Sequence, residues 1–358
     1  MSIWRFADRM ASVAPQQRIT LGEGDTPLVH SRRIGPSIGI DRLYFKLESA
    51  GPSGSYKDRF AAVAISAMLA QGKSRCVASS SGNTGAALAA YCAAAGISCE
   101  IAIVETAPTA KLLQMLAYGA RLQRVRGFGL DKEITQRTFD RLAEIGKAED
   151  AALQISAYHY SPIGMSGVQS ISYELREQTA ELGVGLDHVF VPAGGGGLAL
   201  AVVRGFELLK ASDDELSSPA VHVVQSEGND TIATPLREGQ SRARAVTCTS
   251  AVSGLQVPSI IDGNETIAEC AASGGTGYTV SDAEVWSMQA RLAREEGVFC
   301  EPAAAVALTG AVKAVELGEI SPDAVVVCLV TGIAFKDPPS LERMAADCEC
   351  PIISYSDI

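Results

Sequence analysis

The sequence lacks the long hydrophobic runs that membrane proteins and exported precursors carry. Its main apolar stretches, Phe60–Ala70, Ala86–Ala95 and Ala324–Val330, are shorter than the ~20 residues that a helix needs to cross a bilayer. The opening residues, MSIWRFADRM, have no apolar core of the kind found in secretory signals. We therefore expect a cytoplasmic protein that does not associate with a membrane.

The sequence also has few positive charges. It contains 30 Lys and Arg residues against 41 Asp and Glu residues, which gives a net charge of −11. Such a surface repels phosphate backbones, so nucleic acid is not an expected partner. The nine cysteines form no CxxC pair, and Cys348 and Cys350 have no histidine near them in the acidic tail. We interpret the cysteines mostly as small buried hydrophobic residues in a reducing compartment, and we predict no metal site.

What the sequence does contain is typical of a soluble globular protein of about two domains at ~150 residues each. It is 47% hydrophobic and 20% charged, with no evident repeat or linker. Short runs rich in branched residues alternate with Ala-rich segments, which predicts parallel strands covered by helices on both faces, an α/β fold of three layers. The expected strands are 43–47, 75–78, 99–104, 189–191, 221–224 and 324–330. The expected helices are 56–71, 84–95, 109–118, 133–145, 167–182, 198–209, 282–296 and 302–317.

Four consecutive glycines separate a strand from a helix in HVFVPAGGGGLALAVV. They are Gly194, Gly195, Gly196 and Gly197, and they let backbone N–H groups approach an anion where the helix adds its partial positive charge. This pattern predicts a phosphate site. A tight turn without a ligand is the plain alternative, and a dinucleotide is a second one that the absence of GxGxxG disfavours.

A lysine stands in the first turn of a predicted helix in ESAGPSGSYKDRFAAVAI. The helix dipole disfavours a cation at this end, so the pKa of Lys57 should be lowered. A lysine of that kind suits nucleophilic attack on an aldehyde to form a Schiff base. The alternative is an ordinary surface lysine. Gly54 and Ser55 disfavour this alternative, because such small residues permit a close approach to the amine.

A third strand-to-helix turn, in RCVASSSGNTGAALAAY, gathers hydroxyl and amide groups around two glycines. Ser80, Ser81, Asn83 and Thr84 together would hold a carboxylate, whereas ordinary helix capping needs only one such residue. A phosphate loop, a carboxylate loop and an unusual lysine together indicate a phosphorylated aldehyde cofactor that acts on an amino acid.

At this point the sequence resembles the fold type II pyridoxal-phosphate enzymes, the tryptophan synthase β family, and among them the threonine synthases most closely. The resemblance runs from LGEGDTPL at 21–28 to TGIAFKDP at 331–338. Its most specific segments are SGSYKDR, SSGNTGAALAAY, QMLAYGA, PAGGGG and EGVFCEPAAA. The resemblance implies two lobes of αβα type with mostly parallel sheets, a larger one from 1–37 and 169–358 and a smaller, mobile one from 38–168.

The resemblance also implies a role for each matching residue. Lys57 would form the Schiff base with pyridoxal 5'-phosphate and later move protons on the substrate, and Asn83 would bond the phenolic oxygen of the cofactor. Thr331 would face the pyridine nitrogen, where a hydroxyl favours elimination and replacement over transamination. The substrate carboxylate would be held by Ser80, Ser81 and Thr84, and the cofactor phosphate by Gly194, Gly195, Gly196, Gly197 and Leu198.

The chain departs from the threonine synthase pattern where those enzymes hold the substrate's phosphate. Aligned on the helix that ends in SYEL at 172–175, their Asn-Ser pair becomes Tyr158 and His159, and their Arg becomes Gly164. Their loop asparagines become Gly195 and Leu198, and Ile333 replaces a His in their TGHG. His159 is a possible substrate contact, with a structural histidine as the alternative.

We therefore expect a lyase of the threonine synthase type that converts O-phosphohomoserine and water to threonine and phosphate, or that takes a variant substrate. A serine/threonine ammonia-lyase or a β-replacement synthase is the alternative, because GGGGL is the form typical of ammonia-lyases. A catalytically inactive ligand-binding regulator is the second alternative. A homodimer is expected from the resemblance alone.

Overall fold

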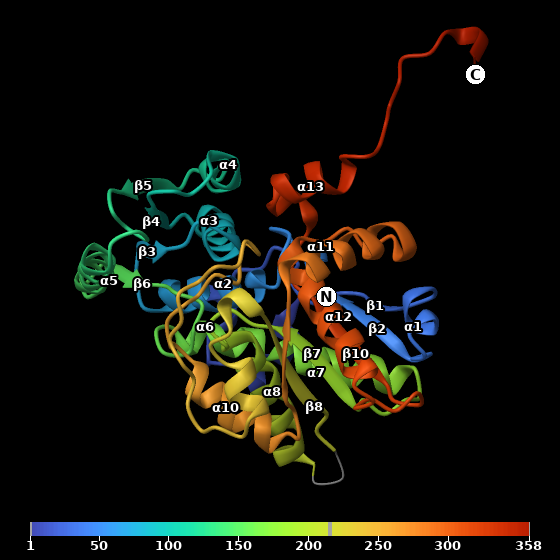
Figure 1. Cartoon of the computed structure of the whole chain (residues 1–358). Coiled ribbons are helices and arrows are strands. Elements are labelled where there is room, and N and C mark those ends of the chain that lie inside the picture. Colours follow the sequence, from blue (N-terminus) through green and yellow to red (C-terminus); the bar gives the residue numbers. More distant parts are fainter. Residues whose placement is uncertain (1, 214–216, 358) are drawn as a thin grey trace.

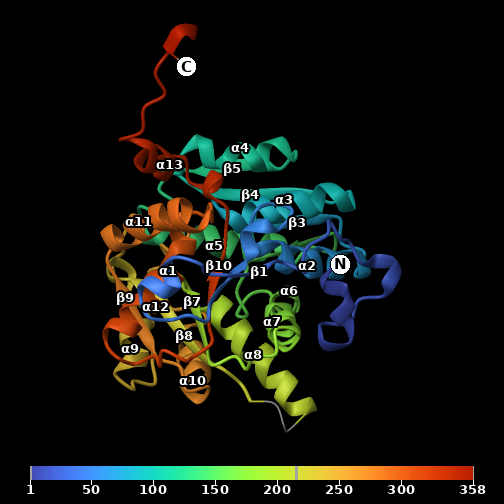
Figure 2. The ribbon, with the colours of Figure 1, turned by 90° about the vertical axis from the view of Figure 1, so that its right-hand side faces the viewer.

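The computed structural model describes residues 2–213 and 217–357, which form two sheets with helices on both faces of each (Figures 1 and 2). The six-stranded sheet has the order β1 (Leu28–His30), β2 (Leu43–Leu47), β10 (Val326–Val330), β7 (His188–Pro192), β8 (Ala220–Ser226), β9 (Gly277–Val280). The four-stranded sheet has the order β5 (Arg121–Val125), β4 (Ser98–Val104), β3 (Arg75–Ser79), β6 (Ala151–Leu153). Only the pairing of β1 with β2 is antiparallel among the described strands.

The helices cover both sheets because the strands bury both of their faces. On one face of the larger sheet the core contains residues of α7 (Ser170–Glu181), α8 (Gly197–Ser212) and α10 (Gly263–Ala272). On the other face it contains residues of α11 (Asp282–Arg291) and α12 (Pro302–Glu316). In the smaller sheet α3 (Asn83–Ala95) covers one face and α5 (Lys132–Gly146) the other. The remaining helices are α1 (Ile34–Ser37), α2 (Lys57–Ala70), α4 (Thr109–Ala117), α6 (Pro162–Val168), α9 (Ala233–Arg237) and α13 (Pro338–Ala345). The predicted α/β architecture, two three-layer αβα lobes with mostly parallel sheets, is thus confirmed.

Several elements differ from the predictions. The strands β1, β5, β6 and β9 were not predicted, because they are short or, like the edge strand β5 with its sequence RLQRV, carry polar residues. The helix predicted at 167–182 is instead two helices, α6 and α7, which meet around Gln169. The helix predicted at 282–296 ends its α-helical part at Arg291 and continues as a π-helical turn.

The strand pairing also bears on the predicted division of the chain. β2 lies inside the segment 38–168, yet it pairs with β10 in the larger sheet. Residues 43–47 therefore belong with the sheet of the larger unit, and the predicted start of the smaller unit at residue 38 lies too early by this criterion. The independence and mobility of the two lobes stay predictions.

Six cysteines are buried, as interpreted from the sequence: Cys76, Cys92, Cys99, Cys270, Cys300 and Cys328. The sulfurs of Cys76, Cys92 and Cys99 lie within 4.8 Å of one another. Cys348 and Cys350 are exposed in the tail after α13, which extends away from the body of the molecule (Figure 1). Among the described residues no helix combines the length and apolar character that crossing a bilayer requires.

A buried ion network fixes the first turns of α2 in the core. The Arg59 guanidinium donates to Glu48 and Glu174, each at 2.7 Å, and the Lys46 ammonium reaches Glu174 at the same distance. All four side chains are at most 1% exposed. Because Arg59 stands two residues after Lys57, this network holds the position of the lysine turn.

Candidate active site

Backbone pairing at the carboxyl end of β10 places the lysine turn beside Thr331. The Tyr56 N–H donates to the Thr331 carbonyl at 3.0 Å, and the Ile333 N–H donates to the Gly54 carbonyl at 3.0 Å. Gly54 has a φ of +91°, and a Cβ there would lie 2.8 Å from Cγ2 of Ile333, so only glycine lets the two segments approach this closely. Thr331 itself is buried, at 4% exposed.

Lys57 is the first residue of α2, where its amine meets little water. Its Nζ donates to Ser156 Oγ at 2.8 Å and lies 4.4 Å from the centre of the Tyr56 ring. Burial lowers the pKa of Lys57 to about 7, although the carboxylates of Asp262 and Glu301 act in the opposite direction. The predicted lowering of this pKa has its main cause in burial. At neutral pH about half of the molecules then carry the free amine that nucleophilic attack requires.

The lowered pKa makes a kinetic prediction. Since the ammonium loses its proton as the pH rises through about 7, the rate at which the protein without cofactor captures pyridoxal phosphate should rise from pH 6 to 8 and then level off. At pH 8 about nine-tenths of such amines are neutral, against less than ~1% for an ordinary lysine. Stopped-flow absorbance measures the rate. A rate that still climbs about tenfold from pH 8 to pH 9 would indicate an ordinary lysine.

Asn83 and Glu301 meet beside Gly332, the residue that follows Thr331. Asn83 begins α3, and its Nδ2 donates to Glu301 Oε1 at 2.7 Å. The Glu301 N–H donates to the Gly332 carbonyl at 3.0 Å, which places Glu301 next to Thr331. Burial raises the pKa of Glu301 to about 7. An amide nitrogen carries two hydrogens, so Asn83 retains one for the phenolic oxygen to which the sequence resemblance assigns it.

The glycine turn adopts the strand–turn–helix geometry expected of a phosphate cradle. Gly194–Gly197 connect β7 to α8, and Gly196 has a φ of +94°. A Cβ at Gly196 would lie 2.4 Å from Thr266 Oγ1, so glycine is required there. Leu198 buries its side chain in the main core at 5% exposed, which leaves its backbone N–H as the group available to a phosphate.

The segment that follows Ser156 joins the lysine to the glycine turn. Ser156 accepts from Lys57, and the Cα of the next residue, Ala157, would lie 3.7 Å from a Cβ at Gly197. The next two residues are Tyr158 and His159, whose backbone N–H groups donate hydrogen bonds to the Asp262 carboxylate at 2.8 and 3.0 Å. The amine and the glycine turn therefore lie around one small region of the molecule.

Asp262 itself is a part of this region that sequence reasoning missed. Its Oδ2 would lie 2.8 Å from a Cβ at Gly197, and its N–H donates to the Gly195 carbonyl at 3.2 Å. The side chain is 2% exposed, and burial raises its pKa despite the hydrogen bonds from His159 and Tyr158. A carboxylate therefore stands beside both the glycine turn and the lysine.

The turn predicted to hold a carboxylate borders a cavity of about 40 Å³. Two amines reach it from other elements, Lys111 of α4 and Lys336 of the short 3-10 helix η6 (Ala334–Lys336), together with Gln114. The turn contributes Ser81, Gly82 and Asn83 to its lining. Cations beside a helix N-terminus suit an anionic group, and the binding of a substrate carboxylate at this turn stays a prediction.

Ser80 also has a purely structural use. Its Oγ accepts from the backbone N–H groups of Gly82 and Gly85 at 3.2 and 3.1 Å, which stabilises the turn that begins α3. His159 is exposed, and its ring packs against Tyr160. The roles predicted for Ser80, Ser81, Thr84 and His159 toward a substrate stay predictions.

The residues around Lys57 fit a phosphorylated pyridine aldehyde. The glycine turn would cradle its phosphate and the free amine would take its aldehyde. The Ser55 hydroxyl, two residues before Lys57, is fully buried and has no hydrogen-bond partner among the described residues. Because an unpaired buried hydroxyl costs about 1–3 kcal/mol, a polar group bound at this turn would relieve that cost.

Three residues of the site escaped the sequence analysis: Ser156, Asp262 and Glu301. Glu301 stands in EGVFCEPAAA, directly before Pro302. A Glu followed by Pro at the start of a helix is the pattern that could have indicated it. Asp262 precedes Gly263 at the start of α10 in a segment with no glycine run or strand pattern. Its proximity to Gly197 arises only from the packing of α10 against α8.

Comparison with known proteins places the whole chain in one group. Residues 19–332 match the family described as "Pyridoxal-phosphate dependent enzyme". Threonine synthase of Methanosarcina acetivorans is 30% identical over 362 residues, which cover 100% of this chain and 85% of its own length. Threonine deaminase isoform 2 from Solanum lycopersicum has a TM-score of 0.74 at 20% identity, covering 97% of this chain and 94% of its own. A fungal L-serine ammonia-lyase from Rhizomucor miehei has a TM-score of 0.73 at 20% identity, covering 91% and 99%. The two structures share the fold.

Proposed function

The chain belongs to the pyridoxal-phosphate-dependent enzymes, and from that premise we propose that it is a lyase of the threonine synthase type that removes a leaving group from the side chain of a small amino acid. Similarity over the full length of the chain to a protein named threonine synthase supports the reaction type. The substitutions at Gly164, Tyr158 and His159 support a variant substrate.

One observation carries this proposal above the others. The Lys57 amine, with a pKa of about 7, contacts Ser156, whose neighbour Ala157 packs against Gly197. A nucleophilic amine and an anion cradle thus lie around the same small volume, which is the arrangement that a phosphorylated aldehyde requires.

The residues would divide the work as follows. Pyridoxal phosphate supplies the aldehyde that takes the amino group and the ring that withdraws electrons from the α-carbon. The backbone N–H groups of Gly194–Gly197 hold the phosphate, and Asn83 holds the phenolic oxygen. The turn of Ser80, Ser81 and Thr84 orients the substrate carboxylate, with Lys111 and Lys336 offsetting its charge. Lys57 Nζ then takes the α-proton, and the low exposure around it keeps water away from the reacting atoms.

Two enzymatic versions of this reaction differ in the group that leaves. In the first, phosphate leaves O-phosphohomoserine and water is added to give threonine, as the relatives' name suggests. In the second, a hydroxyl leaves a serine-like substrate, followed by release of ammonia or by addition of another nucleophile. The second is favoured by Gly164, which stands where the sequence resemblance expects an arginine for the substrate's phosphate. An inactive regulator is disfavoured because Lys57, Asn83 and Thr331 are all present.

The test is a screen of the purified enzyme with bound cofactor against hydroxy amino acids and their phosphate esters. We expect at least one substrate to change the absorbance of the cofactor and to release either phosphate or ammonia with a keto acid. A protein that shows no cofactor absorbance after addition of pyridoxal phosphate and removal of the unbound excess would exclude the lyase and support the regulator.

We propose a homodimer in the cytoplasm whose smaller lobe closes over the substrate. Contacts between the lobes support closure, because Lys111 of α4 pairs with Asp337 at 3.0 Å and Lys336 donates to Gln114 at 2.6 Å. Light scattering and small-angle scattering with and without substrate measure these two properties.

A further inference from the structure

Three cysteines that are far apart in the sequence meet at the smaller sheet. Cys76 of β3 and Cys99 of β4 are paired in register, so their side chains point to the same face of the sheet. α3 covers this face, and Cys92 lies in the last turn of α3 (Figure 1). The three sulfurs lie within 4.8 Å of one another. No local motif marks this cluster, because tertiary packing alone brings its members together.

The three-cysteine cluster lies away from the candidate active site. Cys76 and Cys99 each stand second in their strands, at the amino end, whereas the turn that leads to Asn83 follows the carboxyl end of β3. Along α3, Cys92 comes nine residues after Asn83, which corresponds to about 14 Å at a rise of 1.5 Å per residue. An ion bound by the cluster would therefore not touch the groups assigned to the cofactor.

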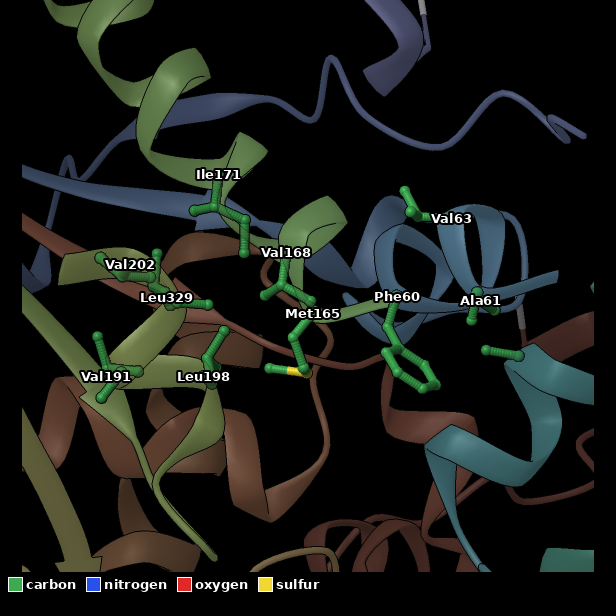
Figure 3. Packing of buried hydrophobic residues seen from close by; sticks show 14 of the residues in the cluster. Phe60, Ala61, Val63, Met165, Val168, Ile171, Val191, Leu198, Val202 and Leu329 are labelled. Atoms are coloured by element: carbon green, nitrogen blue, oxygen red, sulfur yellow. The ribbon is translucent and has the colours of Figure 1, made fainter. Parts of the chain in front are cut away.

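The surroundings of the cluster are apolar, yet the surface is near. All three cysteines belong to the main hydrophobic core, another part of which Figure 3 shows around Phe60 and Met165. Their side chains are at most 6% exposed. The two residues that follow Cys92 are exposed, however, so the thiols lie just beneath the end of α3. Because helix ends open locally at little cost in free energy, a small uncharged solute can reach the thiols by this route.

The number of sulfurs restricts the ions that the cluster can bind. Thiolates select soft ions. With bonds of about 2.3 Å, an ion held by three sulfurs in one plane spaces them about 4.0 Å apart, which is close to the size of this cluster. A structural zinc ion takes four ligands, whereas among the described residues no fourth His, Cys, Asp or Glu joins the three cysteines.

The apolar surroundings restrict the charge of the bound ion. Three thiols lose three protons when they bind one ion, so the complex is neutral only if the ion is trivalent. A divalent ion would leave one negative charge in the core and a monovalent ion would leave two. A buried charge without a partner is strongly unfavourable, so a trivalent ion is the best match for this cluster.

From these observations we propose that Cys76, Cys92 and Cys99 form a binding site for one trivalent thiophilic ion of the arsenic(III) class. Arsenous acid, As(OH)₃, is uncharged at neutral pH and can therefore enter an apolar site. Three As–S bonds form while three As–O and three S–H bonds break, and three water molecules leave. No atom is oxidised or reduced, and the product carries no net charge. This inference does not depend on the proposed function.

The experiment adds arsenite to the reduced enzyme with bound cofactor, in full-length protein carrying Cys348→Ser and Cys350→Ser. These substitutions remove the two exposed thiols of the tail, which would otherwise compete for the ion. Native mass spectrometry should show one arsenic atom per chain. X-ray absorption at the arsenic edge should show three sulfur neighbours and no oxygen. Failure to bind, or arsenic with fewer than three sulfurs, would overturn the inference without touching the lyase proposal.

Single substitutions in the same protein identify the ligands. Cys76→Ala, Cys92→Ala and Cys99→Ala should each weaken arsenite binding by at least about 100-fold, since even the loss of a group that only supports a ligand costs roughly 10–100-fold. Cys270→Ala is the matched control, because it removes an equally buried thiol from another helix, α10. Its affinity should stay within about twofold of the parent.

Equal affinity in these four variants would place the arsenic on other thiols and refute the assignment. The X-ray absorption measurement requires no substitution in the core, so it tests the site even if an alanine variant fails to fold.

Discussion

Replacing Lys57 with alanine should lower turnover by at least about 10⁴-fold, the upper end of what a single positioned proton-transfer group contributes, because the same amine also captures the cofactor. The variant should lose the visible absorbance of the bound cofactor. It should keep its fold, since Lys57 is only half-buried and its side chain makes one hydrogen bond, to Ser156.

The matched control for this variant is Lys132→Ala, which removes an exposed lysine from the first residue of another helix, α5. Turnover and absorbance of the control should equal those of wild type. If Lys57→Ala retained the absorbance band and more than a few per cent of the activity, another lysine would be the cofactor's partner.

Replacing Arg59 with methionine should destabilise the protein by about 3–5 kcal/mol, the usual cost of removing one partner from a buried ion pair. Methionine keeps most of the length of the side chain but leaves Glu48 and Glu174 with only the Lys46 ammonium as a buried cation in the network. The loss should appear in denaturant unfolding as a lower midpoint with an unchanged slope. Since Arg59 anchors α2, the variant should also bind pyridoxal phosphate more weakly.

The same substitution in an exposed pair provides the comparison. Arg121 reaches Glu100 at 3.0 Å, but its side chain is 68% exposed, so Arg121→Met should cost less than about 1 kcal/mol. Equal stability of the two variants would show that the ion network around Arg59 does not hold α2 in place.

The sequence predicted the parts of the fold whose signals are local. The buried strand β10 is a continuous run of apolar residues, and so is β7 after His188. The helices α3 and α12 are Ala-rich, and α8 is an apolar helix that follows the glycine turn. The strand β5 escaped prediction because its exposed, charged residues carry no apolar pattern. The break between α6 and α7 has no proline or glycine at Gln169 to signal it.

The residues of the candidate site also differ in whether a local sequence pattern marks them. Lys57, Asn83 and Gly194–Gly197 stand in turns whose composition alone is unusual, so the sequence could identify them. Asp262 and Ser156 reach the site only through tertiary packing, and neither occupies a segment with a distinctive pattern. The pairing of Asn83 with Glu301 joins residues 218 positions apart, which no local pattern could indicate.

Chemical trapping tests the central claim most directly. Reduction of the cofactor-loaded protein with borohydride should fix pyridoxal phosphate permanently on the amine that holds it, and peptide mass spectrometry then identifies that amine. The account predicts that a single modified peptide, the one containing Lys57, carries the added mass. Label on Lys336, Lys111 or any other lysine in place of Lys57 would contradict it.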